Sequence, residues 1–412
     1  MRPDLSSSPS QNALASHSFG AMPDLAGRTI LQIIPELNAG GAERTTVDIA
    51  EALVAAGARA LVACEGGRLV SELQARGGLW IPFAAKTKNP LRMALNVGKL
   101  QDIIRRERVD LVHARSRAPA WVALGAARRA GVPFVTTYHG AYAGTSTLKV
   151  QYNSVMARGD VVIANSEFTR DRIVEMHPFA SERIVVIHRG ADLRAFQPDQ
   201  VATARVQTLR RAWGVEPDER IVLLAARLTS WKGQRVLIDA AKALKQRSVQ
   251  GVSFILAGDE QGRTGYAKEL DERIAAAGLN GIVRRVGHCA DMPAAFQSAD
   301  VVCVPSIEPE AFGRSAVEAQ AMGVPVVVTN IGAAPETVLA PPQAPESERT
   351  GWRVPPDDVQ ALADALAQML ALGASQRDAL ASRARRHVES HFSVEMMCAR
   401  TLAVYQDLFA RR

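Results

Sequence analysis

Two glutamates with seven residues between them, Glu310 and Glu318, frame the sequence EAFGRSAVE. An apolar run over 300–306 predicts a strand before them, and SAVEAQAMG predicts a helix after them. Gly313 lets the backbone approach a ligand closely, and the helix start presents unpaired N–H groups that suit a phosphate. The two carboxylates are able to accept hydrogen bonds from the hydroxyls of a sugar or a ribose. Spacing alone is equally compatible with two solvated glutamates.

The loop RLTSWKG over 227–233 offers a second set of charges, because Arg227 and Lys232 precede the start of another predicted helix. Arginine is a planar donor fork and lysine a mobile point charge, and both suit a diphosphate. Two solvated cations beside a turn are the alternative interpretation. The loop by itself does not decide between them.

Two weaker candidates lie in the first half of the chain. The loop NAGGAE over 38–43 places Gly41 after a predicted strand, but it is not the GxGxxG dinucleotide fingerprint and is also typical of a tight turn. His139 ends the predicted strand PFVTTYHG, at the edge where open α/β sheets bind ligands. A lone histidine is more often structural. Each considered alone, His113, His188 and His288 are likewise interpreted as structural.

Strand-like runs alternate with helical patterns along the whole chain, which predicts parallel α/β units. The pattern occurs twice. The strand, glycine loop and helix from 30 onward are matched from 221 onward, and GVPFVTTYHG (131–140) is matched by GVPVVVTNIG (323–332), both at an offset of 192 residues. A constant offset predicts two copies of one doubly wound fold, with the ligand site in the cleft between them.

The repeat sets the expected domain organisation. We expect a disordered tail over 1–26, a first Rossmann-like lobe over 27–200 and a second over 201–392. The lobes join near 192–215, and 340–352 is expected to be a surface loop of the second lobe. An amphipathic helix over 393–412 is able to pack on either lobe, the first lobe included.

The composition fits this organisation, since 412 residues with 47 % apolar and 22 % charged residues exceed what one core holds and exclude a disordered chain. The four cysteines lie far apart, so neither a disulfide framework nor a zinc site is expected. Residues 1–26 lack a signal-peptide core, and no run of about 20 apolar residues is present. We therefore expect a cytoplasmic protein that does not span a membrane.

Taken together, these motifs resemble the retaining glycosyltransferases of family 4, which have the GT-B fold. The resemblance covers nearly all of 28–392, and the E-x7-E spacing behind an Arg/Lys loop is its most specific part. It is carried by GGAE (40–43), HG (139–140), the Arg227/Lys232 loop, AGDE (257–260), the block 286–306, EAFGRSAVE and GAAPE (332–336).

The resemblance implies a donor site for a nucleotide-sugar in the second lobe. Arg227 and Lys232 would bind the diphosphate and neutralise the charge that grows on it as the glycosidic bond breaks. Glu310 would hold the sugar hydroxyls, together with the backbone N–H groups of Phe312, Gly313 and Arg314. Arg227, Lys232, Glu310 and His139 form the implied catalytic set.

Other residues complete the implied site. Glu318 would hold the ribose, and Gly287 and His288 would frame the base. Gly41 would bring first-lobe backbone against the phosphates, and His139 would touch the sugar from the acceptor side. Ser166 would help bind the acceptor or the phosphate.

The implied reaction is front-face displacement with retention, in which a donor phosphate oxygen takes the acceptor proton and no dedicated base is needed. The sequence lacks a D-x-D pair, so we expect no metal, and no cofactor beyond the nucleotide-sugar substrate. One departure stands out, because Arg189 in HRGAD stands where the family often has Asn. This puts the interlobe contact expected there in doubt.

The acceptor side is predicted from charge. Between Lys86 and Arg129 eleven basic residues accompany three acidic ones, a local excess larger than the net charge of +7 of the whole chain. A basic first lobe favours a lipid-linked or polysaccharide acceptor, as in lipopolysaccharide synthesis, and peripheral contact with the anionic inner membrane. An ordinary solvated helix is the alternative. Nucleic acid is not expected, since no aromatic residues interleave these cations.

A UDP-sugar is the favoured donor, with GDP-mannose second. Two alternative functions stay open. One is a nucleotide-sugar epimerase or sugar phosphorylase of similar fold, and the other is a non-catalytic nucleotide-sugar-binding protein. The intact Glu310, Glu318, Arg227 and Lys232 argue against the non-catalytic alternative. The sequence does not name the sugar, the base or the acceptor.

Overall fold

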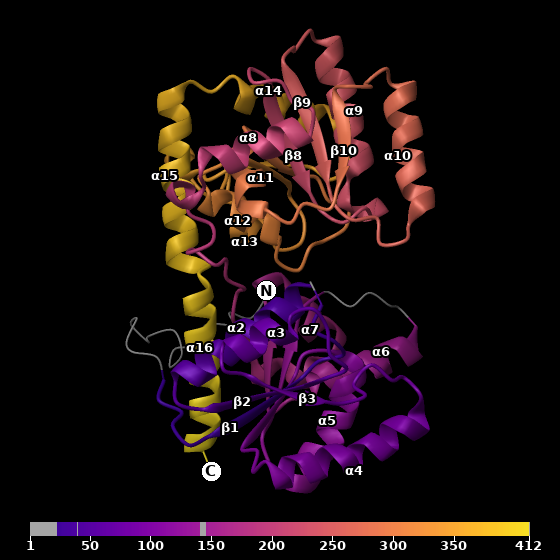
Figure 1. Cartoon of the computed structure of the whole chain (residues 1–412), viewed down its shortest axis with the longest axis vertical. Helices are drawn as coiled ribbons and strands as arrows, with labels where there is room; N and C mark the ends of the chain where they lie inside the picture. The colour runs from indigo at the N-terminus through magenta and orange to yellow at the C-terminus, as the bar shows by residue number, and fades with distance from the viewer. Residues whose placement is uncertain (1–22, 39, 141–145, 412) are drawn as a thin grey trace, which may run out of the picture.

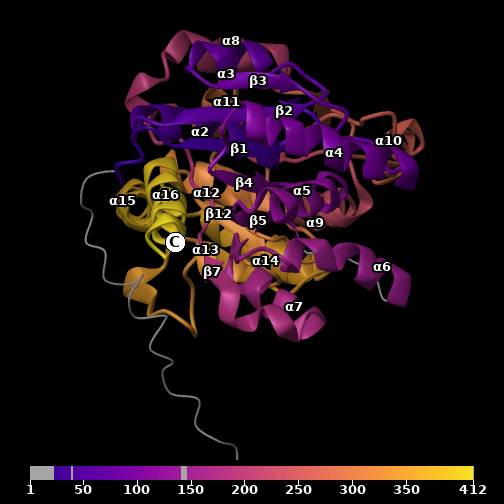
Figure 2. The ribbon, with the colours of Figure 1, turned by 90° about the horizontal axis from the view of Figure 1, so that it is seen from below.

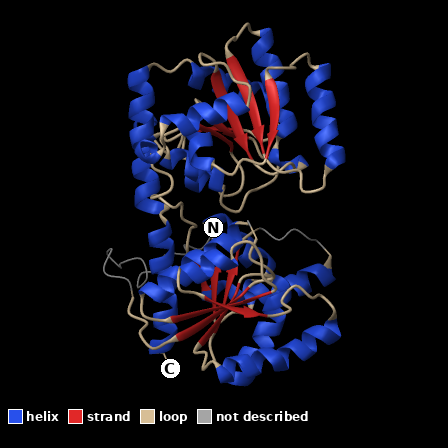
Figure 3. Ribbon diagram, viewed as in Figure 1, coloured by secondary structure: helices blue, strands red, loops and turns tan. Residues whose placement is uncertain are grey.

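The computed structural model describes residues 23–38, 40–140 and 146–411, and there the chain folds into two lobes, each a parallel sheet surrounded by helices (Figures 1 and 3). Of the tail expected over 1–26, residues 1–22 lie outside the described residues. Leu25 is only 2 % exposed, and its N–H donates to the Ala56 carbonyl. The ordered first lobe therefore begins before residue 27, because this leucine joins the core.

The first lobe contains a parallel sheet in the order β3-β2-β1-β4-β5-β6-β7. Its strands are β1 (Thr29–Ile33), β2 (Arg59–Cys64), β3 (Leu79–Pro82), β4 (Leu111–Ala114), β5 (Phe134–Tyr138), β6 (Val161–Ala164) and β7 (Ile184–Val186). The helices around it are α2 (Gly41–Ala55), α3 (Val70–Ala75), α4 (Pro90–Arg106), α5 (Arg117–Ala130), α6 (Thr147–Asn153) and α7 (Glu167–Met176).

The second lobe contains a parallel sheet in the order β10-β9-β8-β11-β12-β13. Its strands are β8 (Arg220–Ala225), β9 (Val252–Ala257), β10 (Val283–Gly287), β11 (Val301–Val304), β12 (Val326–Thr329) and β13 (Trp352–Val354). The helices of this lobe are α8 (Thr203–Ala212), α9 (Gln234–Gln246), α10 (Thr264–Ala276), α11 (Met292–Ser298), α12 (Arg314–Ala321), α13 (Ala334–Thr337), α14 (Val359–Leu370) and α15 (Ala374–His391).

The two sheets repeat one topology, which confirms the predicted pair of Rossmann-like lobes. The run β2-β1-β4-β5 in the first sheet has its counterpart in β9-β8-β11-β12 of the second. The central strands read as continuous apolar runs because both faces are covered, by separate hydrophobic clusters on either side of each sheet. The carboxyl ends of β1, β5, β8 and β11 consequently lead into the loops that carry the predicted site.

The last two helices connect the lobes. Helix α15 packs against α12 in the second lobe, and α16 (Val394–Ala410) packs against α2 in the first; Figure 1 shows them running down one side of the molecule, and Figure 2 shows their ends from below. Ser393 caps α16 by accepting from the Met396 N–H. The Tyr405 hydroxyl lies 2.5 Å from Nδ1 of the buried His113. Among the described residues, no helix is both long and apolar enough to cross a bilayer.

Candidate functional site

The loops that follow β8 and β11 are packed directly on each other. Gly233 has φ +75°, and a Cβ there would lie 1.8 Å from the Pro305 carbonyl oxygen. The Ile307 N–H donates to the Trp231 carbonyl at 2.8 Å. Glycine is required at position 233 both for the left-handed backbone and for this close approach. The contact brings the Lys232 loop and the Glu310 loop together.

Lys232 and Glu310 form an ion pair at this junction. The Lys232 Nζ lies 2.8 Å from the Glu310 Oε1, and the two side chains are 15 % and 16 % exposed. The Ser306 hydroxyl donates to the same carboxylate oxygen. Lys232 also lies over the Trp231 ring, 4.3 Å from its centroid. A cation and a hydrogen-bond acceptor therefore lie side by side, a combination that suits a ligand with phosphate and hydroxyl groups.

The start of α12 borders the site beside Glu310. Gly313 has φ +84° and precedes the first helical residue, and the Ser315 hydroxyl donates to the Ala225 carbonyl at the end of β8 (2.8 Å). The Arg314 Nη2 lies 2.5 Å from the Glu318 Oε1, and this carboxylate raises the pKa of Arg314. Phe312 as a whole residue is only 3 % exposed, and the ligand contact expected of its backbone stays a prediction.

On the first-lobe side, Gly41 opens α2 and faces the second lobe. A side chain at this position would contact the Arg189 guanidinium and Cδ of Arg314. Because glycine has no side chain, both arginines are able to lie close to the start of α2. Arg189 Nη2 lies 2.7 Å from His139 Nδ1. Because a guanidinium only donates, Nδ1 is the acceptor and Nε2 carries the proton. Burial, then Arg189 and Arg115, hold the pKa of His139 well below its ordinary value, so the ring is neutral.

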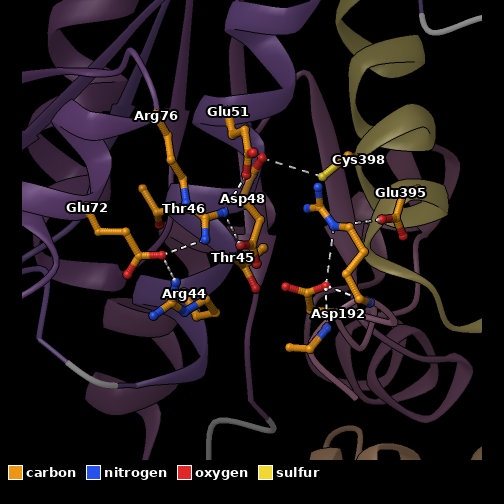
Figure 4. Close-up of polar contacts among 12 residues, drawn as sticks. Arg44, Thr45, Thr46, Asp48, Glu51, Glu72, Arg76, Asp192, Glu395 and Cys398 are labelled. Atoms are coloured by element: carbon orange, nitrogen blue, oxygen red, sulfur yellow. Dashed lines mark hydrogen bonds and ion pairs between the residues drawn. The ribbon is translucent and has the colours of Figure 1, made fainter. Parts of the chain in front are cut away.

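A buried acid lies behind this surface on α2. The Asp48 side chain is 11 % exposed, and its Oδ1 lies 3.8 Å from Nη1 of Arg76. Burial raises the pKa of Asp48 to about 6, while Arg44, Arg76 and the second-lobe Arg314 oppose that rise. Figure 4 shows Asp48 between the Arg76 guanidinium and the segment that carries Asp192.

The remaining predicted residues lie at the same edge of the second sheet without a direct contact to the Lys232–Glu310 pair. Arg227 is exposed, and its Nη1 lies 3.4 Å from the Gln261 Oε1. Gly287 and His288 are exposed at the end of β10, where the Gly287 carbonyl accepts from the Gly258 N–H at 2.8 Å. Their contribution to binding stays a prediction.

Several residues beside the site were given no role in the sequence analysis. Ser306, Arg189 and Glu336 were not assigned a role, and His188 was assigned none beyond structure. His188 Nε2 lies 2.9 Å from Glu336 Oε2. The interlobe contact that the sequence analysis placed in doubt at Arg189 is therefore made by the preceding residue, His188.

Ser166 is fully buried and caps α7 by accepting from the Thr169 N–H. Its hydroxyl also donates to the Thr169 hydroxyl at 2.9 Å, and its contribution to binding stays a prediction.

Two hollows adjoin these residues. One, of about 280 Å³, lies between β11, β12 and α12 and is lined in part by Ser306, Glu310 and Gly313. The other, of about 340 Å³, lies in the first lobe and is lined in part by Gly140 and Asn153. The described residues contain no group of three or more His, Cys, Asp or Glu side chains arranged to hold a metal ion. Metal independence stays a prediction.

Comparison with known proteins gives consistent matches. A family model described as "Glycosyl transferases group 1" matches residues 206–387, and one described as "Glycosyltransferase Family 4" matches residues 39–195. A glycosyltransferase structure from Rickettsia africae is 33 % identical, with a TM-score of 0.84 over 93 % of this chain and 98 % of that one. HepE from Anabaena, in complex with UDP and glucose, is 26 % identical, with a TM-score of 0.79 over 92 % of this chain and 100 % of that one.

A sequence relative adds a named activity of its own. The D-inositol 3-phosphate glycosyltransferase of Mycobacterium tuberculosis is 31 % identical over 321 residues, which are 72 % of this chain. The match spans 61 % of the length of that relative.

Proposed function

This chain is a GT-B glycosyltransferase of family 4, and from that premise we propose that it is a retaining hexosyltransferase. It moves a sugar from a nucleotide-sugar, with UDP-sugars favoured over GDP-mannose, to a lipid-linked or polysaccharide acceptor. The likeness to a structure that holds UDP and glucose supports the donor class. The observation that carries the proposal is the Lys232–Glu310 pair at 2.8 Å, in the loops that end β8 and β11 and face the first lobe.

Each residue has a distinct part in this proposal. Lys232 and Arg227 bind the diphosphate, and Lys232 compensates the charge that grows on it as the bond to the sugar breaks. Glu310, fixed by Lys232 and Ser306, accepts hydrogen bonds from the sugar hydroxyls. The N–H groups at the start of α12 add donors for anionic or hydroxyl oxygens. Neutral His139 donates from Nε2 to the sugar on the acceptor side.

The chemical step needs no group beyond the two substrates and these contacts. The acceptor hydroxyl oxygen attacks the anomeric carbon on the face from which the diphosphate leaves. The carbon–oxygen bond to the diphosphate breaks, and a phosphate oxygen takes the acceptor proton. The products are the glycosylated acceptor, with the anomeric configuration kept, and the nucleoside diphosphate.

Thermal stabilisation by UDP-, GDP- and ADP-sugars identifies the donor, and release of nucleoside diphosphate on adding acceptor then measures transfer. Lys232→Met and Glu310→Gln should lower the transfer rate by about 100-fold, on the order of one lost transition-state contact. Lys268→Met and Glu272→Gln are matched controls, since that pair is 79 % and 67 % exposed at 3.6 Å. Equal rates in the site and control variants would refute the assignment, and NMR of the product tests retention.

The acceptor side supports a second part of the proposal, contact of a cytoplasmic enzyme with the inner membrane. On α4, Leu91 and Leu95 are 78 % and 68 % exposed one turn apart, and Arg92 and Lys99 on the same helix are exposed cations. Such a helix suits an anionic bilayer surface. Arg115, counted within the basic segment, is instead 3 % exposed and donates to Gln32, so it is not available to lipid.

Co-sedimentation with vesicles tests this contact. Phosphatidylglycerol vesicles should retain the protein at low salt and release it at high salt, whereas phosphatidylcholine vesicles should not retain it. The double variant Leu91→Ser/Leu95→Ser should lower retention at least tenfold, because two large apolar side chains leave the interface. Undiminished retention would exclude α4 as the contact.

A further inference from the structure

Glu336 of the second lobe reaches across to the first. It belongs to α13, and its two carboxylate oxygens accept from the Glu167 N–H at 2.7 Å and the Phe168 N–H at 2.8 Å. These are the first two N–H groups of α7, whose dipole favours a negative charge at this end. His188 Nε2 completes the set at 2.9 Å. All three of these groups that bond to the carboxylate belong to the first lobe.

The segment that carries Glu336 is also fastened to the donor loop. The Ala333 N–H donates to the Glu310 carbonyl at 2.9 Å. Gly332 has φ +63°, and a Cβ there would lie 2.4 Å from the same carbonyl oxygen, so the two backbones are in close contact. Residues 332–336 therefore connect the Glu310 backbone at one end with α7 of the other lobe at the other.

A second contact runs in parallel. The His188 ring lies 6.4 Å from the Phe312 ring and 5.4 Å from the Phe392 ring, measured between centroids, and the two phenyl rings lie 5.7 Å apart. Phe312 stands two residues after Glu310, and Phe392 lies where the chain crosses from α15 to α16. One first-lobe side chain thus touches both Glu336 and the donor loop.

We propose that Glu336 is a positioning residue that couples the meeting of the lobes to the placement of Glu310. With its carboxylate on α7, segment 332–336 holds the Glu310 backbone where its side chain meets Lys232 and the donor sugar. Without that contact segment 332–336 is no longer held on α7, and the donor loop loses this part of its support from the first lobe. The coupling rests on the proposed function for its catalytic consequence, but its structural part is measurable in the protein alone.

Amide hydrogen exchange on the full chain tests the structural part. In Glu336→Ala, the Glu167 and Phe168 N–H groups lose their acceptor and should exchange at least tenfold faster. The Ala333 N–H, which bonds to Glu310, should also exchange faster if the segment transmits the change. Unchanged protection at Ala333 would overturn the coupling, whether or not the protein transfers sugar. Glu348→Gln, at an exposed site twelve residues further on, is the matched control.

Kinetics test the consequence. We expect kcat to fall about 100-fold in Glu336→Ala, on the scale of a small misplacement of a binding group, and about 10-fold in Glu336→Gln, which keeps one acceptor oxygen. UDP affinity should stay within about twofold, because Glu336 bonds to no predicted nucleotide contact. A wild-type kcat, or an equal loss of kcat and UDP affinity with lower thermal stability, would overturn the positioning role. A wild-type protein that neither binds nucleotide nor transfers sugar refutes the proposed function instead.

Discussion

The contact between Gly233 and Pro305 decides whether the Lys232 loop reaches Glu310, and Gly233→Ala tests it. The new Cβ would start 1.8 Å from the Pro305 carbonyl oxygen, so one backbone must move by more than about 1 Å to restore a normal contact. The left-handed φ of +75° adds about 1 kcal/mol for a non-glycine residue. Overpacking of this kind adds about 1–3 kcal/mol. We expect a total loss of about 2–4 kcal/mol.

Gly251→Ala is the matched control, because Gly251 has φ +66° and no atom within 4 Å of an added Cβ. It should lose only the conformational share, about 1 kcal/mol. Urea unfolding of both variants measures this difference. A displaced Lys232 loop should also weaken UDP binding by about tenfold in Gly233→Ala and leave it unchanged in Gly251→Ala, as measured by calorimetry.

A difference of less than about 0.5 kcal/mol between the two alanine variants would refute this reasoning, since it would mean that the loop at 233 has room for a side chain. Retained stability with lost UDP binding would point to a local shift of the loop without strain in the lobe. That outcome would also contradict the tight contact.

Burial raises the pKa of Asp48 from its usual 3.8 to about 6, so between these pH values the folded chain holds a proton that the unfolded chain has lost. The free energy of unfolding should therefore fall as pH rises through this window, by up to about 3 kcal/mol. Urea unfolding at several pH values should show that Asp48→Asn lacks this pH-dependent loss, whereas the wild type has it. Arg189→Asn removes a cation from His139 Nδ1 and should raise the pKa of that ring, a shift that NMR titration detects. Tyr405→Phe leaves Nδ1 of buried His113 without its hydroxyl partner and should cost about 1–3 kcal/mol in urea unfolding.

The repeat in the sequence was sufficient to predict the fold. Strands buried on both faces must be apolar throughout, so their residue types survive as a readable pattern. The match of 131–140 with 323–332 corresponds to β5 and β12, which hold equivalent places in the two sheets. The sequence left open which lobe the last helix packs on, and the structure packs α16 against α2 of the first lobe.

The interlobe contacts could not be predicted in the same way. Glu336 looked like part of a motif and His188 like a lone structural histidine, yet they meet across 148 positions of sequence. Ser166 carried a family-like sequence but is a helix cap, because its hydroxyl is used by α7. No local pattern states which side chain faces which lobe.

By itself, the sequence determined the two doubly wound lobes, the loops at the ends of β8 and β11, and the residue types in them. These follow from local periodicity and from the glycines that sharp turns require. Only the tertiary structure decided that Lys232 pairs with Glu310, that Arg189 turns to His139, and that Glu336 rests on α7. Those contacts depend on how two separately folded sheets approach each other, and that geometry is set by long-range packing rather than by neighbours in the chain.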